Sequence, residues 1–464
     1  MRHRAVVCLT LALGLVPCAA AAAQEGEHSP NMSFVENLPY EAADADGTPN
    51  FGTDIEFATI SGREYALAGS YENGLHIVDI TDPQNAQVAG IYDCGVTQGD
   101  VQVFRQDDEP GRVFATYTSD TFGDGDSTCY REAEALGFDV QKDDGSEEGK
   151  NGSFIVEVTD PSSPRTVSFA EVPQGSHNQS VHPSGNYMYN SNSDLITSLQ
   201  PAIEVIDISD PSAPHTVGEL SLPTRPGLGT ESHDITFSDD GARAYSAALS
   251  QGVIIDSTDP ANPEIVTSFL DPAINVWHQS DPVTVGDSEY LFVEDEFAGA
   301  AGGPICPSGG FHIYDITGDK EQSPEKVGYW NIDEVGLTNN PTSTCTAHVF
   351  DIHEDAGIMN VAFYDGGVRV VDISGLAEGE GLRQVGSYRH GDADTWSAKT
   401  PRIEEDGSFY LYGNDMARGL DIYRFDASAP ESESIGTWLS PLQASAQLPR
   451  APVGTPQLAC LLAR

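Results

Sequence analysis

Short apolar runs separated by turn residues recur along most of the chain. The runs of the first group are residues 53–57, 65–68, 75–80 and 87–92. Apolar runs of this length, bounded by Gly, Pro, Asn and Asp, are typical of β-strands joined by tight turns. Each such group therefore predicts four short antiparallel strands, which is the content of one β-propeller blade.

Seven groups of this kind follow one another. They are residues 53–92, 101–161, 176–223, 232–270, 277–332, 347–388 and 397–438, and the last group ends in an apolar run at 435–438. Seven groups of four strands predict an all-β fold, a seven-bladed β-propeller of four-stranded antiparallel blades, over residues 50–440. Residues 24–49 are a polar extension that can add one strand at 34–38. Residues 441–464 are rich in Pro, Ala and Gln and are expected to be disordered.

Three segments at the same position in their groups share a motif. Residues 74–80 read Gly-Leu-His-Ile-Val-Asp-Ile, residues 202–208 read Ala-Ile-Glu-Val-Ile-Asp-Ile, and residues 367–373 read Gly-Val-Arg-Val-Val-Asp-Ile. The motif resembles the LVIVD repeat of exported bacterial and archaeal β-propeller proteins. The resemblance implies the propeller fold and export, and it implies no particular activity. The Asp of the motif is assigned to turn capping.

Four histidines occupy one position of the repeat, at the start of the first strand. They are His177, His233, His278 and His348, and Asp100 holds the matching position in the second group. A closed ring brings equivalent positions of successive blades to one axis, so the imidazoles are expected to converge. Imidazoles with one carboxylate suit Zn, Cu or Fe, and an open coordination position is typical of a catalytic metal site.

Acidic residues near the histidines are candidates for supporting roles. Asp54, Asp234 and Asp351 are expected to accept hydrogen bonds from imidazole N–H groups. Glu294 and Asp295, at the end of a second strand, are expected on the same face of the disc, where they can act as acid or base. The alternative is a structural ring in which each histidine bonds a neighbouring blade. The arrangement of four histidines on a seven-bladed propeller is similar to that of the carotenoid cleavage oxygenases and the selenium-binding protein/methanethiol oxidase family. None of the surrounding motifs of either family occurs here, so neither reaction is implied.

Two long insertions, about residues 119–150 and 297–310, follow second strands and are expected on the face where the histidines begin. Each carries a cysteine, and a second cysteine lies in the link that enters the same group for the first insertion and the next group for the second. The expected disulfides are Cys94 with Cys129 and Cys306 with Cys345, which leaves Cys460 unpaired.

The first 23 residues have the features of a secretory signal peptide: Arg2 and Arg4, an apolar run, and small residues before a cleavage point near Ala23. Cys18 follows Pro17, which suits a lipoprotein cleavage box poorly. No later run is long enough to span a bilayer. We expect an exported, monomeric protein that is secreted, periplasmic or held at the cell surface.

The chain is strongly acidic, with 72 Asp and Glu against 22 Lys and Arg and a formal charge of −50. Such a field repels nucleic acid and anionic membranes. The expected partners are therefore a small molecule or a cell-surface partner. Two functions remain open from the sequence. The first is a transition-metal enzyme, an oxidoreductase or hydrolase acting on a small molecule. The second is a non-catalytic propeller that binds a protein or polymer at the cell surface.

Overall fold

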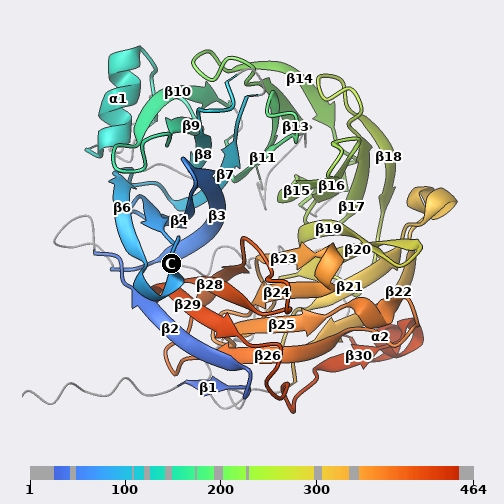
Figure 1. Ribbon diagram of the computed structural model, residues 1–464. Coiled ribbons are helices and arrows are strands. Elements are labelled where there is room, and N and C mark those ends of the chain that lie inside the picture. The colour runs from blue at the N-terminus through green and yellow to red at the C-terminus, as the bar shows by residue number, and fades with distance from the viewer. Residues whose placement is uncertain are drawn as a thin grey trace, which may run out of the picture.

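The chain forms a ring of seven antiparallel sheets around a central axis (Figure 1). The computed structural model describes residues 26–41, 49–106, 109–119, 126–141, 149–172, 175–192, 202–225, 229–296, 306–333 and 344–448. The predicted seven-bladed β-propeller is confirmed. The expected signal peptide, parts of both insertions and Cys460 lie outside the described residues.

Blades 1 to 4 contain four consecutive strands each. Blade 1 comprises β3 to β6 (Gly52–Ile60, Arg63–Ser70, Leu75–Asp79, Gln87–Tyr92), and blade 2 comprises β7 to β10 (Gln98–Phe104, Phe114–Ser119, Gly152–Glu157, Arg165–Glu171). Blade 3 comprises β11 to β14 (Asn178–Val181, Tyr187–Ser191, Ala202–Asp207, His215–Ser221), and blade 4 comprises β15 to β18 (Asp234–Phe237, Arg243–Ala247, Gly252–Asp256, Glu264–Phe269).

Blades 5 to 7 each gain a strand from an end of the chain. Blade 5 comprises β19 to β22 (Trp277–Val285, Ser288–Asp295, Phe311–Asp315, Glu325–Asn331) with β30 (Thr437–Leu439). Blade 6 comprises β23 to β26 (Phe350–His353, Ile358–Ala362, Val368–Asp372, Arg383–Arg389) with β1 (Glu27–His28). Blade 7 comprises β27 to β29 (Thr395–Lys399, Phe409–Asp415, Gly419–Phe425) with β2 (Met32–Leu38). Short 3-10 helices cover Pro83–Asn85, Gly318–Gln322, Glu354–Ala356 and Ser374–Leu376.

The ring is closed by the N-terminal segment. Strand β2 pairs antiparallel with β29 and completes blade 7. The run at 435–438 was expected to be the fourth strand of that blade. It contributes instead to β30, which pairs with β22 in blade 5 and places Trp438 opposite Trp330. A side chain at Gly328 would collide with the Trp438 indole, so glycine is required where β30 approaches.

Residues 441–447, expected within a disordered tail, form helix α2 (Pro441–Gln447). Its N-terminus has Pro at the first helical position and a hydrogen bond from the Ser440 backbone N–H to the Gln443 side chain. The helix buries Ala444 against Tyr329 and Leu439 of blade 5. The folded part of the chain therefore extends beyond residue 440.

The first strand of each blade lies nearest the axis, as β3, β7, β11 and β15 show in Figure 1. Alternate apolar side chains of the outer strands fill the space between adjacent blades, and the resulting clusters join neighbouring blades around the ring. This packing fixes the first strands, and their inner edges surround the central cavity.

Both expected disulfides are confirmed. Cys94 pairs with Cys129, the second residue of helix α1 (Thr128–Leu136), and Cys306 pairs with Cys345. The first bond ties the blade 2 insertion to the link that enters blade 2, and the second ties the blade 5 insertion to the link that enters blade 6. Neither α1 nor α2, the helices among the described residues, is long and apolar enough to cross a membrane.

Candidate metal centre

The repeat sets the positions of the histidines through the backbone. The N–H groups of His177, His233 and His348 donate to carbonyls at the end of the second strand of the same blade, at 2.7, 2.7 and 2.9 Å. His278 is the second residue of β19, where the ladder with β20 shifts register. The repeated geometry therefore places the four side chains at one level of the ring.

The four imidazoles lie in a continuous arc near the axis. Ring centroids are 4.4 Å apart for His177 and His233, 4.0 Å for His233 and His278, and 4.4 Å for His278 and His348. All four residues are buried. The expected convergence is therefore present in the structure.

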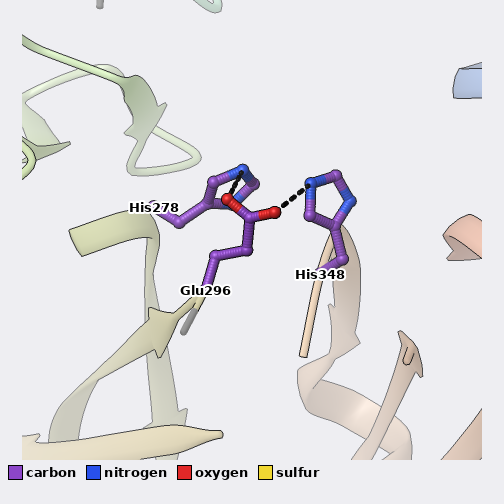
Figure 2. Close-up of side chains that lie close together, drawn as sticks. All are labelled: His278, Glu296 and His348. Atoms are coloured by element: carbon purple, nitrogen blue, oxygen red, sulfur yellow. Dashed lines mark ion pairs between the residues drawn. The ribbon is translucent and has the colours of Figure 1, made fainter. Parts of the chain in front are cut away.

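Glu296 lies between the last two histidines of the arc, as Figure 2 shows. Its carboxylate oxygens are 3.7 Å from Nε2 of His278 and 3.8 Å from Nε2 of His348. One ligand atom from each of the three residues falls within 4.8 Å of the others, so the group could hold a metal ion. Ligand atoms about 2.0–2.2 Å from one zinc ion stand roughly 3–3.5 Å apart. The separations of 3.7 and 3.8 Å are slightly wider than this, and the limit of 4.8 Å for the whole group is wider still, so the three side chains must move together to bind an ion.

The Nδ1 atoms of three histidines face fixed acceptors. Nδ1 of His233 lies 3.0 Å from the carbonyl of His278, and Nδ1 of His348 lies 2.6 Å from the carbonyl of Trp396. A carbonyl oxygen only accepts, so each Nδ1 carries the proton and Nε2 keeps its lone pair. Nδ1 of His278 lies 2.7 Å from the Glu294 carboxylate. An acceptor behind Nδ1, with the Nε2 lone pair turned the other way, is the usual arrangement of a metal-binding histidine.

The contact between Glu294 and His278 is close but poorly aligned. Neither carboxylate oxygen of Glu294 has a hydrogen bond among the described residues, and Nδ1 of His278 has none either. Glu294 is fully buried. Burial, together with the charges of Glu296 and Asp295, raises the pKa of Glu294 well above its usual range.

The electrostatics favour neutral imidazoles. Burial lowers the pKa of His348 to about 3. Burial and the neighbouring imidazoles also hold the pKa values of His233 and His278 well below the ordinary value. The neutral imidazole is the form that binds a metal, and these three rings are in that form at neutral pH.

The other end of the arc has a different partner. Nε2 of His177 is 2.9 Å from Nε2 of His233 and 3.2 Å from the side-chain amide of Gln98. Asp100, expected beside the ring, accepts a hydrogen bond from the backbone N–H of Gln179 at 3.0 Å. The strand is irregular between residues 98 and 100, and Gln98 is the blade 2 residue that reaches His177.

The remaining aspartates have structural contacts. Asp54 lies 3.0 Å from the Lys399 ammonium, and the carboxylate of Asp234 accepts from the backbone N–H of the next residue at 2.7 Å. Asp351 accepts from the backbone N–H of Thr400 at 2.8 Å. Two backbone carbonyls accept from the imidazoles of His233 and His348 instead, and Glu294 is the carboxylate nearest to Nδ1 of His278.

Asp295 and Glu296 point in opposite directions from the end of β20. Asp295 accepts from the backbone N–H groups of Asn275 and Val276 at 3.1 and 2.9 Å and holds the entry to β19. Glu296 was not predicted as a site residue, and its side chain lies on the same side of the strand as that of Glu294. Side chains two residues apart lie on one side of a strand, so this spacing was the signal that could have identified it.

The first strands enclose a cavity of about 430 Å³ that reaches His233, His278 and His348. Tyr364 and Trp396 belong to an aromatic cluster beside His348, and the Tyr364 hydroxyl donates to Glu296 at 2.7 Å. Trp396 also lines the cavity, so the centre lies where aromatic side chains meet a polar channel.

Fold and site together define a β-propeller with a candidate metal centre at its axis. The LVIVD repeat model matches residues 59–94 and 175–221. The chain is thus an LVIVD-repeat β-propeller protein. No curated protein matches it in sequence.

Solved structures with a similar fold are distant in sequence. The β-propeller domain of Cps50 (Swd1) from Myceliophteria thermophila is 9% identical, with 85% of this chain and 99% of that chain covered and a TM-score of 0.51. Hydrazine synthase from Kuenenia stuttgartiensis is 11% identical, with 82% and 98% covered and a TM-score of 0.50. A functionally unknown protein from Desulfotomaculum acetoxidans is 13% identical, with 70% and 83% covered and a TM-score of 0.43. At these identities the likeness shows the fold alone.

Proposed function

We propose that this protein is an exported metalloenzyme that binds one transition-metal ion through His278, His348 and Glu296. The reaction is the oxidation or hydrolysis of a small molecule in the central channel. The metal decides between the two: zinc favours hydrolysis, and iron or copper favours oxidation. The predicted signal peptide and the two disulfides support the export part of the proposal.

The observation that carries the proposal is the orientation of the rings. His348 and His278 have their Nδ1 atoms against acceptors, and both Nε2 atoms lie near the carboxylate of Glu296. Nε2 of His348 has no hydrogen bond among the described residues, although the residue is buried. A buried polar atom without a partner is costly, and a bound metal would remove that cost.

The surrounding residues have separate tasks in this proposal. Glu294 holds the His278 ring and takes or releases a proton at its carboxyl group, whose pKa is raised by burial. Tyr364 orients Glu296 through its hydroxyl group. A metal bound here supplies a Lewis acid or a redox partner, and two imidazoles with one carboxylate leave positions open for substrate.

Elemental analysis of the mature protein, purified without a histidine tag, tests the proposal. We expect about one equivalent of Zn, Fe or Cu, and we expect its loss in a variant with His278→Ala and His348→Ala. His76→Gln is the matched control, because His76 is equally buried, lies in β5 and stacks on Tyr40. The control variant should keep its metal.

A protein that contains no metal and takes up none on titration would contradict the proposal and favour the non-catalytic propeller. Equal metal loss in His76→Gln would attribute the effect to general destabilisation. Metal that remains bound in the double variant would move the site to another set of ligands.

A further inference from the structure

A second cavity lies between blades 5 and 6, among their outer strands and β1. It measures about 490 Å³ and lies away from the central channel. Its lining includes two arginines and several neutral polar side chains: Arg369, Arg389, Gln384, Ser387, Ser432 and Ser434. A cavity of this size accommodates a small organic molecule.

Arg369 is the unusual residue of this cavity. It belongs to β25 and is 3% exposed, and among the described residues its side chain makes one hydrogen bond, from Nη1 to the carbonyl of Val368 at 2.9 Å. No carboxylate among the described residues lies within ion-pair distance of its guanidinium, although the chain carries a large excess of acid. Buried charges in proteins are normally paired, because removing an ion from water is costly.

The carboxylates that line the same cavity are already engaged or lie in solvent. Glu27 forms an ion pair with Arg389 and its side chain is 78% exposed. Asp333 accepts from the hydroxyls of Ser434 and Thr437 at 2.8 and 3.0 Å. Glu433 is exposed. Burial and the charge of Arg389 lower the pKa of Arg369 to about 9, and the carboxylate of Glu27, which pairs with Arg389, offsets only part of this effect.

We propose that this cavity binds a small organic oxyanion, a carboxylate or a phosphate ester, whose oxygens pair with the guanidinium of Arg369. The planar guanidinium presents parallel N–H groups that match two oxygens of such a group. The hydroxyls of Ser387 and Ser432 are placed to donate further hydrogen bonds from the cavity wall. The site is separate from the candidate metal centre, and its occupancy does not depend on metal.

Thermal unfolding of the mature protein, dialysed against chloride, tests the site. Sodium acetate and sodium phosphate are the probes, each compared with chloride at equal ionic strength. We expect a saturable rise in Tm with at least one probe. The stronger probe identifies the head group, acetate for a carboxylate and phosphate for a phosphate ester.

Arg369→Gln should weaken the response roughly 10-fold or more, the loss of one charge-assisted contact. Arg383→Gln is the matched control, because Arg383 lies in the same blade but is already paired with Glu431 and Asp372. Ser387→Leu provides a second test, since it fills the cavity and leaves the arginine in place. An undiminished response in Arg369→Gln or Ser387→Leu, or no response in the unmodified protein, would overturn the proposal.

Discussion

Replacement of Glu294 by Gln separates a metal centre from a set of packed histidines. The amide keeps the shape of the side chain but removes the charge that lies 2.7 Å from Nδ1 of His278. If His278 binds a metal through Nε2, its Nδ1–H points at this carboxylate and the ring becomes a better ligand. If the histidines are only packed, the substitution removes an unsatisfied buried carboxyl and affects no metal.

The expected size of the effect follows from the position of Glu294. Loss of the residue behind a metal-binding histidine reduces metal affinity by about 10- to 100-fold, which is about 1.4–2.7 kcal/mol. We expect the upper part of this range, because Glu294 is fully buried and its carboxyl group has no hydrogen bond among the described residues. A buried charge acts through a low local dielectric and is poorly replaced by an amide dipole.

The pH dependence of binding gives a second signature. At a pH below the raised pKa of Glu294, the metal-free protein holds a proton on this carboxyl group, whereas metal-bound His278 favours the carboxylate. Binding therefore releases this proton, and affinity rises with pH by about tenfold per unit until the pKa of Glu294 is passed. The Glu294→Gln variant should lack this part of the pH dependence.

Competition with a chromophoric chelator measures both effects. Glu204→Gln is the matched control, because Glu204 is also a buried carboxyl group on a blade strand, β13, and accepts a hydrogen bond from Asn190 at 2.9 Å. The control should bind metal as the unmodified protein does. A Glu294→Gln variant within twofold of the unmodified affinity, with an unchanged pH profile, would refute the assigned role.

Two further predictions concern stability. The Lys399→Met substitution should lower the free energy of unfolding by about 3–5 kcal/mol, because the ammonium lies 3.0 Å from Asp54 and 2.8 Å from Glu56 at the junction of blades 7 and 1. Thermal unfolding measures this loss, and an unchanged Tm would show that solvent already neutralises these carboxylates. Joint replacement of Cys306 and Cys345 by Ser should cost about 4 kcal/mol by chain entropy, because the bond closes a separation of 39 residues. Urea unfolding under non-reducing conditions measures this loss, and equal stability would argue against the bond in solution.

The blades could be predicted from sequence because each is local. Alternating apolar and polar residues, with turn residues every few positions, specify a four-stranded unit within one continuous stretch of sequence. Ring closure depends on pairing between the ends of the chain, and two segments, residues 34–38 and 435–438, had suitable composition. The structure pairs the first with β29 and the second with β22. The composition of a strand does not specify which strand it pairs with, so the blade that each terminal segment joins could not be predicted from the sequence pattern.

The candidate site was predictable to the same extent. The shared register of the four histidines follows from the repeat, and their convergence follows from ring closure. The groups behind the rings do not, because the carbonyls of His278 and Trp396 are backbone atoms without a side-chain signature. The irregularity of the first strand of blade 2, which brings Gln98 to His177, also has no clear mark in the composition.

The cavity beside the histidine arc indicates one direction of access to the proposed metal. The insertions were expected on the face where the histidines begin, and parts of both lie outside the described residues. In the described part of the chain, the aromatic rings of Tyr364 and Trp396 lie on one side of His348, 4.7 and 4.5 Å from it, and both residues are less than 8% exposed. The cavity that reaches the histidines extends instead along the first strands to Thr236 and Asp281, which also line a larger depression of about 1300 Å³. Within the described residues, this depression is a route from solvent to the proposed metal, and the carboxylates along it favour a neutral or cationic small molecule over an anion.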